Sequence, residues 1–204
     1  MTPERFIEIP QGLQMLVENF ALGYLQKGRK DWDEPHTRAV VEYAVEIGRK
    51  SKLDVLVLFT AAWLHDTGYY AQFRQGESEK YDSIQDKKEA HMIKGKDVAK
   101  DFFENRWVKG WYTPGREERI IHLIGVHDKV SEPKDLDEIV LMEADTLGAI
   151  DISKVKPTYN KEEAEKYIKN SLEEKRIPRF QTKEGRAYLE KLLGSFKAFY
   201  GINQ

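Results

Sequence analysis

Residues 53–64 constrain the fold more than any other stretch of the chain. Leucine, valine, phenylalanine, alanine and tryptophan side chains follow one another there with little polar interruption. A helix that is apolar on every side has to be buried on every side, so this stretch predicts a central helix surrounded by others. It ends in His65 and Asp66, and a buried aspartate is rare unless it is paired or binds a metal ion. We therefore expect the interior to carry a chemical site at that pair.

Apolar residues recur at helical spacing in most of the remaining chain, and no segment shows the two-residue alternation of a strand. The pattern predicts further helices at about 12–27, 36–50, 87–104, 116–128, 136–149 and 182–200, and a solvated helix that Pro178 ends. The polar stretch 69–86 is expected to be a loop, either a lid over the site or an ordinary surface loop. The fold class is all-α. We expect one domain over residues 1–204, with its core at about 12–150 and helices from 151–204 packed on it.

The last predicted helix carries an apolar stripe made of Leu189, Leu192, Leu193, Phe196 and Tyr200. Such a stripe at helical spacing is expected to pack on the core. The alternative is that it forms the seam of a homodimer.

The overall composition excludes several classes of protein. The chain has 33 basic and 35 acidic residues and a net charge of −2, which gives no reason to expect nucleic-acid binding. It has no cysteine, which excludes disulfides, thiolate metal sites and a cysteine nucleophile. No apolar run reaches the roughly 20 residues that span a bilayer, and the first residues lack the pattern of a signal peptide. We expect a cytoplasmic protein that does not enter a membrane.

Four of the five histidines lie on predicted apolar helix faces, namely His36, His65, His91 and His127. One such histidine is usually a hydrogen-bonded core residue, but four of them together with Asp66 and Asp145 point to a shared site. Imidazole and carboxylate donors without thiolate suit Mn, Fe, Co, Ni or Zn, and helical bundles draw metal ligands from separate helices. His122 lies about 140° around the helix from His127, so a structural role is favoured for it.

The residues follow one another in a recognisable order. His36 comes first, the pair His65 and Asp66 second, and Asp145 last, and this order resembles the HD superfamily of metal-dependent phosphohydrolases. The local sequence is similar at 36–40, 61–68 and 144–145. The segments around His91 and His127 resemble the additional histidine segments of members with two metal ions. The resemblance covers about 36–150, and parts of the tail resemble small stand-alone bacterial HD hydrolases.

The resemblance implies an all-helical bundle with the metal site at its centre. The ligands of a first ion would be His36, His65, Asp66 and Asp145. His91 and His127 would complete a second site with Asp66 as the bridge, or would contact phosphate beside a single ion. The implied activity is that of a phosphatase, phosphodiesterase or nucleotide pyrophosphatase acting on a small phosphorylated substrate, with a nucleotide favoured. Asp66 would be the catalytic residue, because it could accept the proton of a metal-activated water.

Other groups are candidates by position alone. Lys94, Lys129 and Arg74 could hold the phosphate, and Tyr69, Tyr70 or Phe73 could stack on a base, although burial in the core explains the aromatic residues equally well. Two alternative functions stay open, a non-catalytic module that binds metal or nucleotide and a di-iron HD oxygenase. The complete set of candidate ligands favours the hydrolase over the non-catalytic module.

Overall fold

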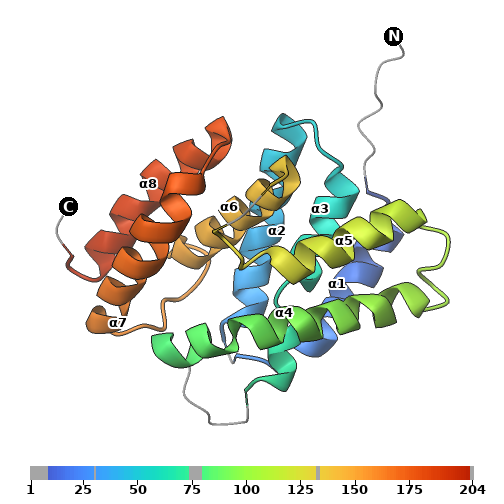
Figure 1. The fold of residues 1–204 in the computed structure, drawn as a ribbon, viewed down its shortest axis with the longest axis horizontal. Coiled ribbons are helices and arrows are strands. Elements are labelled where there is room, and N and C mark those ends of the chain that lie inside the picture. Colours follow the sequence, from blue (N-terminus) through green and yellow to red (C-terminus); the bar gives the residue numbers. More distant parts are fainter. Residues whose placement is uncertain (1–8, 30, 74–79, 132–133, 203–204) are drawn as a thin grey trace.

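The computed structural model describes residues 9–29, 31–73, 80–131 and 134–202. Within these ranges the chain forms α-helices with short 3₁₀ and π-helical segments and contains no β-strand, so the fold is all-α, as predicted. The helices labelled in Figure 1 are α1 (Gln11–Leu25), α2 (Asp33–Lys50), α3 (Val55–Leu64), α4 (Tyr81–Glu104), α5 (Pro114–Val126), α6 (Leu136–Ile150), α7 (Lys161–Lys166) and α8 (Lys183–Phe199). Shorter segments are η1 (Thr67–Ala71), η2 (Tyr167–Arg176) and η3 (Ile177–Arg179).

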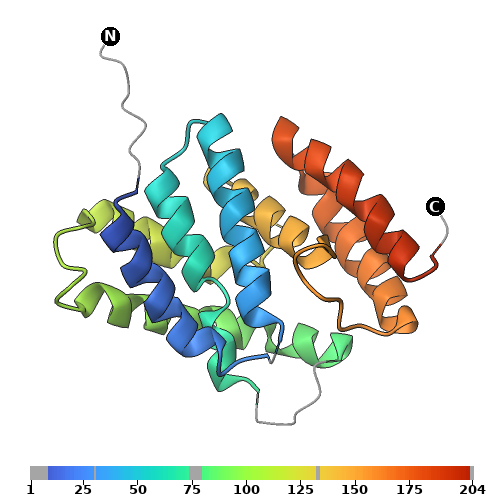
Figure 2. The ribbon, with the colours of Figure 1, turned by 180° about the vertical axis from the view of Figure 1, so that it is seen from behind.

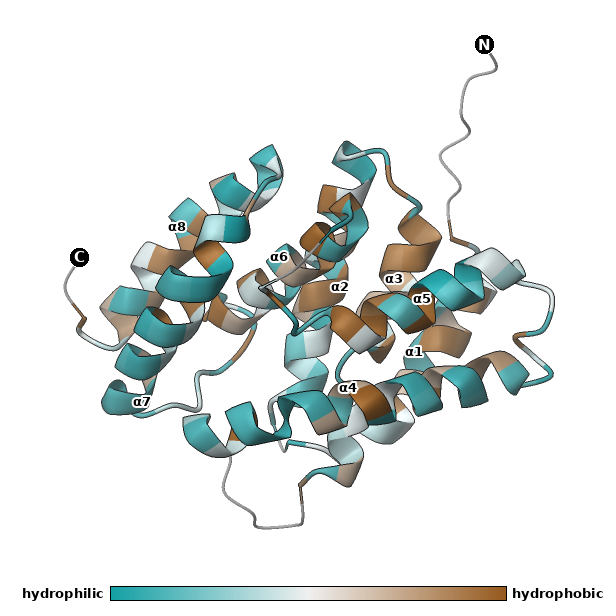
Figure 3. Ribbon diagram, in the orientation of Figure 1, coloured by the Kyte–Doolittle hydropathy of each residue, from teal (hydrophilic) through white to brown (hydrophobic). Residues whose placement is uncertain are grey.

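Helix α3 lies at the centre of the bundle. Its residues 56–64 are all buried, and it contacts α1, α2, α4, α5 and α6. Figure 3 shows it as the most uniformly hydrophobic helix of the molecule. Asp54 begins the helix by accepting hydrogen bonds from the backbone N–H groups of Leu56 and Val57 at 3.1 and 3.3 Å. The prediction of a central, fully buried helix is confirmed.

Helices α2 and α6 pack closely against each other. A Cβ atom on Gly148 of α6 would stand 2.7 Å from Cγ2 of Val40 on α2, so the missing side chain allows this approach. The contact brings His36, near the start of α2, beside Asp145 of α6. Seen from behind in Figure 2, α1, α3, α2 and α6 follow one another across the molecule, with α8 beyond α6.

The segment before α4 differs from the prediction. The helix begins at Tyr81 rather than near residue 87, because Tyr81 and Ile84 are buried and anchor an additional turn and a half. Residues 67–71 form the 3₁₀ helix η1 instead of a loop. The expected loop, whether a lid or a surface loop, therefore covers fewer residues than 69–86, and its residues 74–79 lie outside the described part of the chain.

Of the C-terminal elements, α8 and η2 contact α6. Leu189 and Phe196 of the α8 stripe are buried, and the remaining members of the stripe lie partly buried against the same core, so the core interpretation is confirmed. The homodimer stays a prediction. The solvated helix before Pro178 differs from the expectation, because residues 167–176 form a π-helix. None of the described helices has the length and apolar character needed to cross a membrane.

Candidate metal centre

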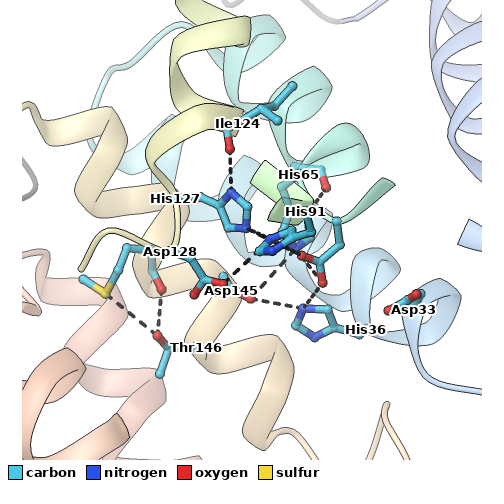
Figure 4. A network of polar contacts seen from close by, with 12 residues as sticks. Asp33, His36, His65, His91, Ile124, His127, Asp128, Asp145 and Thr146 are labelled. Atoms are coloured by element: carbon cyan, nitrogen blue, oxygen red, sulfur yellow. Dashed lines mark hydrogen bonds and ion pairs between the residues drawn. The ribbon is translucent and has the colours of Figure 1, made fainter. Parts of the chain in front are cut away.

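Six side chains predicted from the sequence meet at the lower end of α3. His65 directly follows the last residue of α3 and Asp66 comes next, while the others come from α2 (His36), α4 (His91), the end of α5 (His127) and α6 (Asp145). All six are buried. Figure 4 shows His36, His65, His91, His127 and Asp145 converging on one region. Residues that span more than a hundred positions of the sequence thus share one site.

The carboxylate of Asp66 stands between two pairs of histidines. Its Oδ2 atom lies 3.7 Å from Nε2 of His36 and 3.5 Å from Nε2 of His65. Its Oδ1 atom lies 3.5 Å from Nε2 of both His91 and His127. Each oxygen therefore faces one pair, which is the arrangement of a carboxylate that bridges two ions. The donor atoms in each of these two groups lie within 4.8 Å of one another.

Asp145 belongs to the first pair. Its Oδ1 atom lies 3.1 Å from Nε2 of His36 and 3.8 Å from Nε2 of His65. Its Oδ2 atom accepts a hydrogen bond from Nη1 of Arg176 at 2.7 Å. One oxygen is thus held by a cation while the other faces the imidazoles.

Two of the histidines are oriented by the backbone. Nδ1 of His65 donates to the carbonyl oxygen of Ala62 at 2.7 Å, and Nδ1 of His127 donates to that of Ile124 at 2.8 Å. A carbonyl oxygen can only accept, so in the neutral ring each Nε2 keeps a free lone pair. Both Nε2 atoms point toward Asp66. This is the orientation that a metal-binding histidine requires.

The other two histidines stack on aromatic rings, and Nδ1 of His91 also lies 3.4 Å from the carbonyl oxygen of Lys87. His91 stacks on Tyr69, with ring centres 4.0 Å apart and planes at 6°, and His36 stacks on Trp32 at 5.5 Å and 17°. The Arg29 guanidinium lies 4.1 Å from the centre of the Tyr69 ring. Because Tyr69 is buried and already contacts His91 and Arg29, it does not fit the role of stacking on a base, which was considered for it from the sequence.

The donors fit a divalent cation. Nε2 of His65 is buried without any hydrogen-bond partner, which is costly unless another ligand occupies that position. Burial lowers the pKa of His65, and burial together with His127 lowers the pKa of His91 to about 4. Both rings are therefore neutral at pH 7, the form that binds metal. The hard and intermediate donors, without thiolate, suit first-row divalent ions.

The candidate carboxylates are charged despite their burial. Desolvation would raise the pKa of Asp66, but the nearby His65 and Arg29 hold it well below its usual value. Desolvation would also raise the pKa of Asp145, but Arg176 and His36 hold it well below its ordinary value. Anionic carboxylates are the form that a cation needs.

Three buried or half-buried cationic side chains contact Asp66, Asp145 and the neighbouring Asp128. They were not predicted from the sequence. Nη2 of Arg29 donates to Asp66 Oδ2 at 2.7 Å while its Nε donates to Asp33 at 2.6 Å. Arg176, at the end of η2, contacts both Asp145 and Asp128. Nζ of Lys88 lies 2.9 Å from Asp128 Oδ1.

The sequence held some signal for these residues. Lys88 lies one turn before His91 on the same helix face. Ile168, Leu172 and Arg176 recur every four residues, and the first two are buried. Asp128 repeats, after His127, the pair formed by His65 and Asp66.

The cations predicted from the sequence lie elsewhere. Lys94 lies about 120° around α4 from Lys88, on a different face of the helix. It is half-exposed and its Nζ lies 3.8 Å from Oδ2 of Asp97. Lys129 is exposed and does not line the cavity described below, and Arg74 lies outside the described residues. His122 turns away and its Nε2 lies 2.7 Å from Oε1 of Glu138. Its structural role was the favoured interpretation.

The approach of η1 to α4 depends on glycine. A Cβ atom on Gly68 would stand 1.9 Å from the carbonyl oxygen of His91 and 2.7 Å from the backbone nitrogen of Gly95. Only a residue without a side chain lets the turn after Asp66 lie directly on the backbone that carries His91. The role of Gly68 is thus this close contact between η1 and α4.

A cavity of about 60 Å³ opens beside Asp66. Arg29, Lys88 and Arg176 line it, as do aromatic side chains that include Trp32, Tyr159 and Tyr167. A phosphoryl group with a few water molecules would fit in this cavity, because one water molecule requires roughly 10–15 Å³ of cavity volume. The centre is therefore accessible to a small anionic group.

One comparison, with models of protein families, supports this geometry. Neither the search of curated proteins nor the search of solved structures gave a match. The family model described as "HD domain" matches residues 35–150, which is more than half of the chain and contains all six of the predicted site residues His36, His65, Asp66, His91, His127 and Asp145. The chain belongs to the HD-domain superfamily of metal-dependent phosphohydrolases.

Proposed function

We propose that this protein is a metal-dependent phosphohydrolase that cleaves a phosphate ester or anhydride of a small substrate, for which we favour a nucleotide. The observation that carries the proposal is the position of Asp66, one oxygen of which faces His36 and His65 and the other His91 and His127, beside a cavity lined by cations. A cluster of donors at the floor of a small polar cavity suits hydrolysis of a compact anion.

The chemistry divides between the ion and the protein. Bound by His36, His65, Asp66 and Asp145, with His91 and His127 for a second ion, a divalent cation such as Mn, Fe, Co, Ni or Zn would lower the pKa of water and neutralise phosphate oxygens. Asp66 lies nearest to both groups of donors and would accept the proton of the attacking water. The backbone hydrogen bonds of His65 and His127 would keep these rings fixed throughout.

The phosphate would be held by Arg29, Lys88 and Arg176 rather than by Lys94 or Lys129. All three of these cations line the cavity. Lys88 is the most open of them, with 23% of its side chain exposed against 7% for Arg29 and 5% for Arg176, so it would meet an entering anion first. Arginine and lysine together offer both directional and mobile donors to phosphate oxygens.

The size of the cavity supports a substrate that projects outward. About 60 Å³ is enough for a phosphoryl group but not for a whole nucleotide. The remainder would lie against the aromatic residues at the cavity wall, of which Trp32 is half-buried. The expectations of a cytoplasmic location, of a homodimer and of no binding to nucleic acids stay predictions.

The test combines metal analysis with an assay of phosphate release. The purified chain is stripped with a chelator, reloaded with Mn²⁺, and offered a panel of nucleoside mono-, di- and triphosphates together with p-nitrophenyl phosphate. We expect phosphate or pyrophosphate release from at least one nucleotide, lost on chelation and restored by the ion.

Two variants and a control connect that activity to the site. His65→Ala and Asp66→Ala should each lower kcat by at least about 10³-fold with helicity retained, as removal of a central catalytic group does. His122→Ala, on a solvent-facing histidine, should keep the wild-type rate. Wild-type turnover in either site variant would refute the proposal. Binding of metal or nucleotide without turnover would favour the non-catalytic module, and oxygen uptake by a di-iron form would favour the oxygenase.

A further inference from the structure

The two halves of the metal centre are built alike. In each half, one imidazole is anchored through Nδ1 to a carbonyl three residues earlier, as His65 and His127 are. The other imidazole in each half lies flat on an aromatic ring, His36 on Trp32 and His91 on Tyr69. Asp66 gives one oxygen to each half. The resemblance leads us to look for a counterpart of Asp145 in the second half.

Asp128 occupies that position. Its Oδ2 atom lies 3.8 Å from Nε2 of His91, the same distance that separates Asp145 Oδ1 from Nε2 of His65. Its Oδ1 atom faces the other way, toward Nζ of Lys88 and Nη2 of Arg176. Asp128 therefore repeats the geometry of Asp145, with one oxygen held by cations and the other turned to an imidazole.

One guanidinium joins the two acids. Nη1 of Arg176 donates to Oδ2 of Asp145 at 2.7 Å and to the Thr146 hydroxyl at 2.9 Å, and Nη2 contacts Oδ1 of Asp128. Only 4% of Arg176 is exposed, so these bonds are shielded from competing water. A planar fork with two fixed nitrogens sets the positions of both carboxylates at once, which a lysine could not do. In Figure 4, Asp128 and Asp145 lie side by side next to the imidazoles.

We propose that Asp128 is the terminal ligand of the second ion, as Asp145 is of the first, and that Arg176 is a positioning residue that holds both. The proposal rests on the proposed metal-dependent function, and adds a ligand and a positioning residue to it. Charge supports the assignment. Without Asp128, the donors of the second ion would be His91, His127 and one oxygen of Asp66, which is one carboxylate fewer than the first ion has. The competing interpretation is that Asp128 serves only as the counter-ion of Lys88 and Arg176.

The experiment is a titration of the chelator-stripped protein with Mn²⁺, followed by calorimetry for stoichiometry and by electron paramagnetic resonance for coupling between paired ions. The wild type should bind two ions and show a coupled signal. Asp128→Asn should weaken the second ion by about 100-fold or more, since it removes a charged ligand, and abolish the coupling while the first ion binds as before. Arg176→Gln should weaken both ions by about 10- to 100-fold, the range for loss of a group that orients ligands. Arg176→Lys should restore only part of this loss.

One matched control keeps the test decisive. Asp137→Asn breaks the contact of an aspartate with Arg119 away from the centre and should alter neither ion.

The possible failures are distinguishable. A wild-type protein that binds no ion overturns the proposed function itself. A wild type that binds a single ion, or an Asp128→Asn protein that binds two ions as tightly as the wild type, overturns the present inference and leaves the proposed function standing. Circular dichroism of each variant establishes that it is folded before it is titrated.

Discussion

The stretch matched by the HD-domain model and the segments on either side of it contribute different parts of the centre. Residues 35–150 supply all the candidate ligands, from His36 to Asp145. The two arginines that are buried among the described residues come from outside it, Arg29 from before the stretch and Arg176 from after it. The family stretch thus provides the donor atoms, while the flanking segments fix the carboxylates and compensate their charge.

The difference shows what a donor set alone leaves unfinished. Asp66, Asp128 and Asp145 would repel one another in a buried space without compensation, and each would be driven toward its neutral form. Arg176 holds Oδ2 of Asp145 and leaves Oδ1 directed to His36 and His65. Arg29 donates to Oδ2 of Asp66, the oxygen that also faces His36 and His65. Arg29 and Arg176, which lie outside residues 35–150, therefore help to keep Asp66 and Asp145 charged. The variants below, from the largest expected effect to the smallest, test that division.

The most severe test removes the flanking cation Arg29. Arg29→Gln leaves both Asp33 and Asp66 as buried carboxylates without their partner, and breaking a buried pair costs about 3–5 kcal/mol. We expect a loss of this size in the free energy of unfolding, measured by urea denaturation of the metal-free protein. Arg38→Gln, which removes an exposed arginine that also has two carboxylate partners, should cost less than about 1 kcal/mol. Equal losses for the two variants would mean that the flank is not structurally essential.

The complementary test acts inside the family stretch. Gly68→Ala forces the new methyl group against the backbone of His91 and Gly95, so η1 and α4 must separate. Overpacking of this kind costs about 1–3 kcal/mol, and we expect it to weaken metal binding as well, because Asp66 and His91 move apart. Thermal melting and Mn²⁺ titration measure the two effects. Gly12→Ala, where a Cβ meets nothing within 4 Å, is the control and should be neutral or slightly stabilising.

Asp151, at the junction of the stretch and the C-terminal segment, should contribute a pH-dependent part of the stability. Burial raises the pKa of Asp151, but hydrogen bonds from Ser153 and Tyr43 outweigh it and leave the pKa lowered. A lowered folded-state pKa contributes stability above the unfolded pKa of about 3.9, and the contribution is lost as the pH falls through the folded value. Asp151→Asn should cost about 1 kcal/mol at pH 7 and flatten the acid side of the stability curve in urea denaturation. An unchanged acid limb would contradict this assignment.

The smallest effect is expected at His122. Its bond to Glu138 lies at a partly exposed surface, where such pairs contribute about 0–1 kcal/mol. His122→Ala should therefore leave metal stoichiometry unchanged and shift the melting temperature by only a few degrees. A lost ion in this variant would mean that His122, not His127, belongs to the second half of the centre.

Much of the fold and the candidate ligands could be predicted from the sequence, because the spacing of apolar residues along each helix indicates which face is buried. The all-round apolar run before His65 required a central helix, and the helical spacing of His36, His91, His127 and Asp145 placed them on inward faces. The same rule set His122 apart from His127. The roles of these residues as ligands stay predictions until an ion is measured.

The missing parts depended on tertiary structure. An arginine or lysine is normally solvated, so nothing local marked Arg29 or Arg176 as buried. Lys94 does not line the cavity, because it lies about 120° around α4 from Lys88, which does. The role of Gly68 was not predicted, because the close approach of η1 to α4 joins segments whose contact no local pattern reports.

The stacking of Trp32 on His36 gives the first half of the centre an optical reporter. The chain has four tryptophans, and of these Trp32 alone lines the cavity. Its fluorescence should respond when a paramagnetic ion fills the centre beside His36. Binding of an ion could then be followed optically without a label.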